Sequence, residues 1–402
     1  MKKQVLLSSM LPILLAAAAG VEASEAKERV AELENVVVTS SRTDMDPEKS
    51  PQVVTVITRE QIEQQLAIAS DSSTVLSNLL PSYTPSRQKM TSSGETFRGR
   101  TPLLMVDGVP QSNPLRPTGR EGHSIDFAMV ERIEVIHGAS AVHGLGATGG
   151  IINIITRRPE QGSFNQHASV QTTLPTSELS SETASYKASY RLSGQEQNVD
   201  YLLGLSVEDQ GLFIDGAGDS VGVDNTQGDQ MDTQSYDLLA KLGYWIDDDK
   251  RLRLSLNRYQ IEGQNNYLSV TGDRDKGIST QSERGSPVGH APRNRVLTSS
   301  LSYDDYDFHG MTLKAQLYSQ EFEGLFGAST SGSFQDPGIA PEGTLYDQSR
   351  VLSKKLGSKF SLSKDDLMDG RLKVTGGFDV LVDKSEQDLY LTGRSYVPEV
   401  EY

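Results

Sequence analysis

The chain has 402 residues, a formal net charge of −16 at pH 7 and no cysteine. The negative charge argues against nucleic acid as a partner, because such binding depends on cationic contacts with phosphate groups. No G-x-S-x-G or H-E-x-x-H motif is present, so the sequence offers no recognisable arrangement for catalysis. We therefore expect no enzyme activity and no bound cofactor.

The N-terminus has the pattern of a secretory signal peptide, with Lys2 and Lys3 before an apolar segment from Val5 to Ala19. Small residues follow, and cleavage is predicted after Ala23. The apolar segment is shorter than the roughly 20 residues that cross a bilayer, which argues against a membrane anchor. We predict a signal peptide over residues 1–23.

Residues 24–49 are polar and charged, apart from three consecutive valines at 36–38. Such a composition buries too little apolar surface to fold, so we expect this segment to be mobile. The β-branched trio favours an extended backbone and can add as a strand to the exposed sheet edge of a partner.

Residues 50–160 predict a small α+β domain. The sequence VVTVIT at 53–58 has strand character, and a short helix is expected from 59 to 66. Thr58 is the predicted N-cap of this helix, and Gln61, three residues later, completes a capping box.

The same domain continues with a second expected helix at 72–80 and a strand and turn in LLMVDGVP at 103–110. Two further strands flank a glycine-rich run at 138–150, where the backbone can turn sharply and approach other backbone. The run contains a G-x-G-x-x-G spacing, but the β-branched sequence IINIIT follows where a dinucleotide site needs a helix. A nucleotide site is therefore not favoured. Neither is a metal site at His137 and His143, which flank the turn.

From residue 161 onward, hydrophobic side chains recur at every second position, which predicts about nine β-strands. Short connections alternate with long ones: the short ones fall near 194–198, 247–250, 305–310 and 363–370, and the long ones near 208–233, 263–295 and 323–349. This alternation is typical of outer-membrane β-barrels, which have tight periplasmic turns and large outer loops. A soluble β-sandwich is the alternative. No later stretch of 18 apolar residues exists, so the mature chain is expected to have no transmembrane helix, and a membrane protein without such helices must span the bilayer as a closed β-barrel.

Four segments, in this order, resemble the TonB-dependent outer-membrane receptors. They are ENVVVTS at 34–40, FRGR at 97–100, LLMVDGVP at 103–110 and the glycine-rich stretch from 130 to 159. The resemblance implies an α+β plug domain at 50–160, followed at 161–402 by an antiparallel transmembrane β-barrel in the cell outer membrane. Plugged transporter barrels have 22 strands, so about nine strands predict a fragment that carries the plug and the N-terminal part of the barrel.

The resemblance also implies a function, namely binding of a ferric siderophore and its import into the periplasm. The implied partners are TonB, the ferric siderophore and outer-membrane lipid, and the receptor is expected to be a monomer. FIDGAGD at 213–219 and VDNTQ at 223–227 are similar to a segment of receptors for ferric aerobactin, a hydroxamate–citrate siderophore. A passive or gated porin-like channel is the alternative, although it needs neither the valine trio nor a plug. A signalling transducer of the same family is excluded, since it would need a further domain before residue 34.

Three sets of residues are candidates for function. The resemblance makes the segment at 34–40 a TonB box, with Glu34, Val36, Val37, Val38 and Thr39 as the strand that TonB pairs with. A second set consists of charges expected to fix the plug inside the barrel: Arg98, Arg100, Glu131, Arg132 and Glu134. The alternative for this second set is ordinary solvated charge on a small domain.

The third set is a predicted outward-facing basic patch on two loops of the plug, at 84–96 and 111–124, which contain hardly any acidic residue. Its members are Arg87, Lys89, Arg116, Arg120 and His123. Such a patch would attract an anionic ligand such as a ferric siderophore, and the alternative is ordinary loop charge. The acid-rich segment 209–232 lacks the spacing of a calcium loop, so we expect a flexible, solvated outer loop there.

Overall fold

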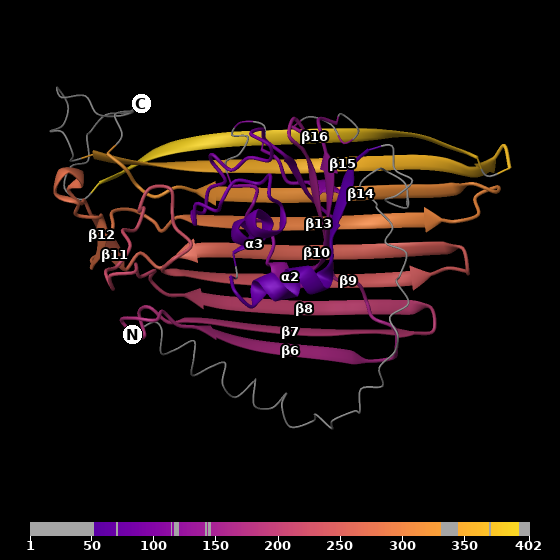
Figure 1. The fold of residues 1–402 in the computed structure, drawn as a ribbon. Coiled ribbons are helices and arrows are strands. Elements are labelled where there is room, and N and C mark those ends of the chain that lie inside the picture. Colours follow the sequence, from indigo (N-terminus) through magenta and orange to yellow (C-terminus); the bar gives the residue numbers. More distant parts are fainter. Residues whose placement is uncertain are drawn as a thin grey trace. The chain divides into compact units, whose positions relative to one another are not determined.

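The structure is a computed structural model that describes residues 52–69, 71–113, 115, 120–140, 143, 146–330, 345–369 and 371–393. The predicted signal peptide and the predicted TonB box lie outside these residues, and so does Arg116. The described chain contains an N-terminal domain up to about residue 160 and a large sheet that follows it (Figure 1).

The N-terminal domain combines a five-stranded sheet with two short helices. Its strands lie in the order β1-β4-β5-β2-β3, and every neighbouring pair is antiparallel except β2 and β5. The elements are β1 (Val54–Ile57), α2 (Arg59–Leu66), α3 (Ser72–Leu79), β2 (Leu103–Val106), β3 (Val109–Pro110), η2 (Phe127–Met129), β4 (Val130–His137) and β5 (Gly150–Thr156).

Helix α2 begins and ends where the sequence predicts. The Thr58 side chain accepts a hydrogen bond from the backbone of Gln61, and the Gln61 side chain accepts one from the backbone of Thr58. These reciprocal bonds satisfy two amides that the first turn leaves without partners. Helix α3 ends one residue earlier than predicted, because Leu80 is its C-cap.

The glycine-rich segment between β4 and β5 brings backbone against backbone. A Cβ atom on Gly149 would lie 2.7 Å from the carbonyl oxygen of Arg100 and 2.9 Å from that of Phe97. Only glycine fits without moving those carbonyls. Strand β5, and not a helix, follows Gly149, as expected from IINIIT.

The large sheet has nine strands in the order β16-β15-β14-β13-β10-β9-β8-β7-β6, all antiparallel to their neighbours (Figure 1). The strands are β6 (Asn165–Thr173), β7 (Ser185–Glu196), β8 (Val199–Gln210), β9 (Thr233–Trp245), β10 (Lys250–Gly263), β13 (Arg293–Asp305), β14 (Thr312–Leu325), β15 (Leu345–Leu367) and β16 (Leu372–Gly393). This is the plug-plus-partial-barrel architecture that the sequence predicts.

The connections alternate in length as predicted. Short turns join β7 to β8, β9 to β10, β13 to β14 and β15 to β16, whereas long links join β8 to β9, β10 to β13 and β14 to β15. The link from β10 to β13 carries a small hairpin of β11 (Tyr267–Val270) and β12 (Gln281–Arg284), with the 3-10 turn η3 (Arg274–Lys276) between them. The strands of the large sheet thus have two ends, and we call the end with the short turns the short-turn end and the end with the long links the long-link end.

The large sheet has an apolar outer face. Leu242, Leu254, Leu301 and Leu317 lie in register across four strands and are each between 45% and 59% exposed. The opposite face packs against the N-terminal domain, whose apolar core includes Leu202 and Leu239 of the large sheet. Among the described helices, none is long and apolar enough to cross a bilayer.

Candidate functional site

The N-terminal domain is held to the large sheet by side chains at both ends of the strands and between them. At the long-link end, the Arg120 guanidinium donates hydrogen bonds to Asn294 Oδ1 (2.7 Å) and to the carbonyl oxygen of Gln227 (2.6 Å). It also lies 4.2 Å from the centroid of the Phe326 ring. Arg120 is 2% exposed. Through these three contacts its side chain joins the domain to β13 and to two long links.

Lys89 makes a second connection at the long-link end. Its ammonium group forms an ion pair with Asp229 and lies 3.9 Å from Asp224 Oδ2, both in the link between β8 and β9. The neighbouring backbone pairs as well, because the Met90 amide donates to the Gly228 carbonyl oxygen at 2.9 Å. The acidic link and the basic loop are thus bound to each other.

A buried polar network also connects the two parts, and two of its members, Lys187 and Glu208, lie near the ends of β7 and β8 that border long links. Lys187 Nζ in β7 lies 2.8 Å from Asp126 Oδ2 and 3.2 Å from Glu208 Oε2. The Asp126 backbone amide donates to Asp237 Oδ2 at 2.6 Å, and Asp237 in turn accepts from Asn257 Nδ2 at 2.6 Å. Buried charges need such partners, because an unpaired charge in this position costs several kcal/mol, roughly 3–5.

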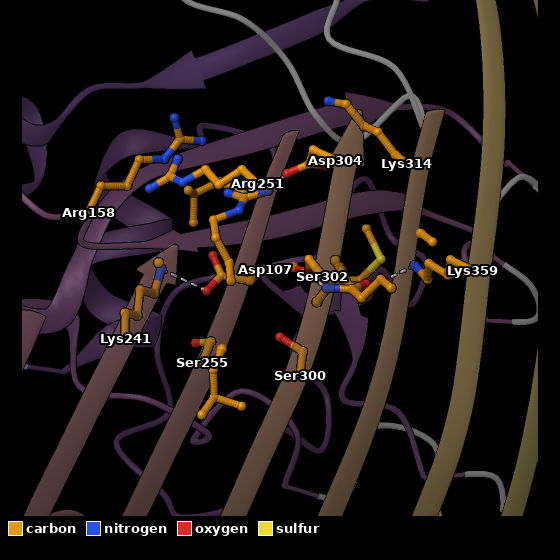
Figure 2. Close-up of a pocket in the computed structure, with 18 of the residues that line it drawn as sticks. Asp107, Arg158, Lys241, Arg251, Ser255, Ser300, Ser302, Asp304, Lys314 and Lys359 are labelled. Atoms are coloured by element: carbon orange, nitrogen blue, oxygen red, sulfur yellow. Dashed lines mark hydrogen bonds and ion pairs between the residues drawn. The ribbon is translucent and has the colours of Figure 1, made fainter. Parts of the chain in front are cut away.

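At the short-turn end, the β2–β3 turn of the N-terminal domain reaches the large sheet through Asp107 (Figure 2). Asp107 Oδ2 lies 3.1 Å from Lys241 Nζ, and the carboxylate accepts bonds from Thr156 N and Oγ1 at 2.9 and 2.6 Å. Burial by itself raises the pKa of Asp107, but the charge of Lys241 and the Thr156 bonds outweigh it and lower that pKa below its ordinary value. Lys359 Nζ holds the other side of the turn by donating to the Gly108 carbonyl oxygen at 2.6 Å.

A cavity of about 310 Å³ surrounds this turn, between the N-terminal domain and the inner face of the large sheet (Figure 2). Its charged lining residues are Asp107, Arg158, Asp200, Lys241, Arg251, Arg253, Asp304, Lys314, Lys359 and Asp379, and the hydroxyls of Ser255, Ser300, Ser302 and Ser361 join them. Cationic side chains therefore outnumber acidic ones around this cavity.

Three members of the predicted outward-facing basic patch do not lie on an exposed basic surface, whereas the ligand-binding role predicted for the set stays a prediction. Arg120 and His123 are 2% and 3% exposed, and Lys89 is paired with acidic residues of the link between β8 and β9. Arg87 is exposed and donates to the Ser93 carbonyl oxygen, while Arg116 lies outside the described residues. The physical reason is that long links from the large sheet cover these loops, and the sequence does not show that contact.

The charges predicted to fix the plug lie as follows. Arg132 Nη2 is 2.7 Å from Glu134 Oε1 within β4, and Glu131 Oε2 is 3.4 Å from Arg157 Nη1. Arg98 and Arg100 are exposed. The role predicted for these five residues stays a prediction. Sequence reasoning assigned Lys89 and Arg120 to another role and missed Asp107, Lys187 and Lys241 as residues that connect the two parts. For Lys241 the available signal was a charge that alternates with hydrophobic residues along 236–246.

The segment 209–232 also differs from the expected solvated loop. Leu212, Val223 and Met231 form a small apolar cluster with Tyr267 of the β11–β12 hairpin. Asp229 and Asp232 are each 7% exposed, so they are not solvated charges. The hydrophobic residues interspersed among the acids were the available signal for this packing.

His137 and His143, which flank the glycine-rich turn, contact different partners. His137 Nε2 lies 2.8 Å from Thr55 Oγ1, and His143 Nδ1 lies 3.4 Å from Lys359 Nζ. Within the described parts of the chain, no group of three or more histidine, aspartate or glutamate side chains is placed to hold a metal ion.

The chain is similar to known proteins in both its N-terminal domain and its large sheet. The family model for the TonB-dependent receptor plug domain matches residues 46–151. The chain is 30% identical over 300 residues to the rhizobactin receptor of Rhizobium meliloti (strain 1021), covering 73% of this chain and 40% of the receptor. It is 27% identical over 381 residues to the ferric aerobactin receptor of Klebsiella pneumoniae, covering 94% of this chain and 50% of that one. The chain thus spans about half the length of these relatives, or less.

Solved structures share the fold at lower identity. The ferric citrate transporter FecA in its unliganded form superposes with a TM-score of 0.65 at 18% identity, covering 88% of this chain and 51% of that one. Pseudomonas aeruginosa FpvA bound to a heterologous ferric pyoverdine gives a TM-score of 0.64 at 16% identity, covering 90% and 46%.

Proposed function

Because the chain belongs to the TonB-dependent receptor family, we propose that it is part of an outer-membrane receptor that binds a ferric siderophore and imports it into the periplasm. The observation that carries this proposal is the combination of a plug domain with relatives that are receptors for rhizobactin and ferric aerobactin. A siderophore of the aerobactin or rhizobactin kind is the first ligand class to test.

The placement of the plug supports energy-coupled transport over passive diffusion. Arg120, Lys187 and Asp107 each form polar contacts across the boundary between the plug and the large sheet. Removal of such contacts requires work, because each leaves buried polar or charged groups without partners. We propose that TonB supplies this work through the valine segment at 34–40, after a signal peptide has directed the chain to the outer membrane.

The ligand is proposed to bind at the long-link end, since short turns face the periplasm and long loops face outward in barrels of this class. The plug loop with Lys89 meets the link between β8 and β9 there. No enzyme activity, cofactor or oligomer forms part of the proposal.

The test is binding and uptake of a panel of ferric siderophores by the full-length receptor. The panel should contain ferric aerobactin, ferric rhizobactin, a catecholate complex and a neutral hydroxamate complex. We expect saturable binding of one carboxylate-bearing complex to the purified receptor, and uptake in cells only when TonB is present. Uptake without TonB would favour the passive channel, and binding of no complex would contradict the proposal.

A further inference from the structure

The cavity around the β2–β3 turn lies at the end of the barrel opposite the long links. Asp200, Arg251 and Asp304 line it, and each is the second residue from a strand end that borders a short turn. The cavity is therefore on the side to which imported ligand would leave, and it is separate from the plug loops at the long-link end.

The residues that line the cavity have a net positive charge, whereas the whole chain has a net negative charge. The chain has a net charge of −16, yet six arginine and lysine side chains and four aspartates line this cavity. Three of the aspartates are already paired: Asp107 with Lys241 (3.1 Å), Asp200 with Arg251 (2.7 Å) and Asp304 with Arg253 (2.5 Å). Arg158, Lys314 and Lys359 bring further positive charge to the same space, and Figure 2 shows Lys241 and Lys359 on opposite sides of Asp107.

Two of the arginines have donors left over. The Nε atoms of Arg251 and Arg253 are buried and have no hydrogen-bond partner within the described part of the chain, although each guanidinium binds an aspartate through Nη2. A buried donor without an acceptor costs about 1–3 kcal/mol. Oxygen atoms of a bound anion or of water are the groups that would remove this cost.

We propose that this cavity is an exit-side binding site for carboxylate-bearing anions, which holds the carboxylates of the ferric complex after it has passed the plug. Guanidinium groups bind carboxylates through paired hydrogen bonds, and serine hydroxyls complete the shell as neutral donors. A volume of about 310 Å³ lies at the lower end of the range of small-molecule sites. The transport role rests on the proposed function, whereas anion binding itself does not.

The chain contains its own reporter for this site. Trp245 is its single tryptophan, and the Arg251 guanidinium carbon lies 4.9 Å from the centroid of the Trp245 ring. An anion that binds Arg251 will alter this cation–π contact and hence the fluorescence of Trp245. If the full-length receptor contains other tryptophans, a Trp245→Phe variant shows which part of the fluorescence change comes from Trp245, because that part is lost in the variant.

The experiment is a titration of the full-length receptor in detergent with citrate, at constant ionic strength, followed by Trp245 fluorescence. We expect a saturable change with citrate and none with glucose. Arg253→Gln and Lys314→Gln should each raise the dissociation constant about tenfold, the scale of one charged hydrogen bond. Lys250→Gln is the matched control, because Lys250 lies at the same strand end, pairs with Asp247 and does not line the cavity.

Several outcomes would overturn the proposal. One is the absence of any saturable change with citrate while the Trp245 signal is present, and another is an equal weakening by Lys250→Gln. Binding of an acidic peptide without binding of citrate would assign the cavity to a protein partner instead. Unchanged emission of the unliganded variants establishes that they are folded.

The second readout is uptake of the ferric siderophore. Arg253→Gln and Lys314→Gln should leave the affinity for external ferric siderophore unchanged and slow uptake several-fold. If the wild-type receptor transports no ferric siderophore, the proposed function fails while the citrate titration still decides the inference. If transport is normal and citrate does not bind, only the inference fails.

Discussion

Asp107 of the plug and Lys241 of β9 form an ion pair across the boundary between the two parts, with Oδ2 and Nζ 3.1 Å apart. Their side chains are 22% and 16% exposed, so both charges are partly removed from water. Thr156 adds two hydrogen bonds to the same carboxylate. The position of the β2–β3 turn therefore depends on the ionised form of Asp107.

Replacing Asp107 with Asn should loosen this turn. The substitution removes the negative charge that Lys241 faces, so we expect the free energy of local opening to fall by about 1–3 kcal/mol. Amide hydrogen exchange in β2 and β3 at pH 7 measures this change. Unchanged protection in the variant would show that the Lys359 and Thr156 contacts suffice.

The same pair predicts a dependence on pH. The pKa of folded Asp107 is lowered, so its contribution to stability is present above the ordinary aspartate pKa and is lost as pH falls through the lower, folded value. We expect wild-type protection of the turn, corrected for intrinsic exchange, to decline below about pH 4. Asp107→Asn should show no such decline, and a parallel decline in both proteins would point to another group.

Arg120→Lys should weaken the contact at the long-link end, although the charge is kept. A lysine cannot bind Asn294 and Gln227 together in the forked geometry, nor stack on Phe326 as the planar guanidinium does. We expect a loss of about 1–3 kcal/mol in local stability, measured by hydrogen exchange at 120–125. Arg87→Lys, at an exposed site, is the control and should have little effect.

Gly243→Ala should destabilise the sheet next to the cavity. A Cβ atom at this position would clash with the carboxylate of Asp200, which Gly243 leaves room for in the neighbouring strand. Displacing Asp200 also breaks its ion pair with Arg251. We expect a cost of about 1–3 kcal/mol in urea unfolding. Gly376→Ala, where a Cβ would meet no atom within 4 Å, should be nearly neutral, and equal effects would contradict the steric argument.

Leu254→Arg tests the assignment of the outer face. Leu254 is 51% exposed and lies in register with Leu242 and Leu301, which places it in the band expected to face lipid. A charge in the middle of that band should cost roughly 2–4 kcal/mol in equilibrium folding into lipid vesicles. Ser279→Arg, in an exposed long link, is the control. A similar cost for both would argue against a lipid-facing surface.

Val37→Pro tests energy coupling. Proline removes an amide and fixes φ, which disfavours pairing with the sheet edge of a partner. We expect binding of the ferric siderophore to be retained and uptake to be lost, as measured with radiolabelled iron in cells. Val37→Ile keeps the strand preference and should transport normally. Normal uptake by Val37→Pro would show that 34–40 is not the TonB box.

Much of the fold could be predicted because its signals are local. The capping box of Thr58 and Gln61 defines the start of α2 within four residues of sequence, and alternation of side chains defines each strand of the large sheet. The lengths of the links then follow from the gaps between strands. These signals need no knowledge of which segments meet in space.

The site could not be predicted in the same way, because its contacts join distant segments. Arg120 and Asn294 are 174 positions apart, and nothing near Arg120 in the sequence indicates that it is buried. A loop rich in basic residues therefore resembled a solvated patch. The cavity at the short-turn end is likewise formed from seven strands of the large sheet and the plug, and no single segment carries its pattern.

The apolar core of the plug is completed by two leucines that it does not itself supply. Leu202 and Leu239 come from neighbouring strands of the large sheet, and both are buried against plug residues. The hydrophobic core of the plug is consequently not formed by plug residues alone. A plug separated from the large sheet would expose the apolar surface that Leu202 and Leu239 now cover, and the large sheet would expose those two leucines. Each part therefore completes the hydrophobic core of the other.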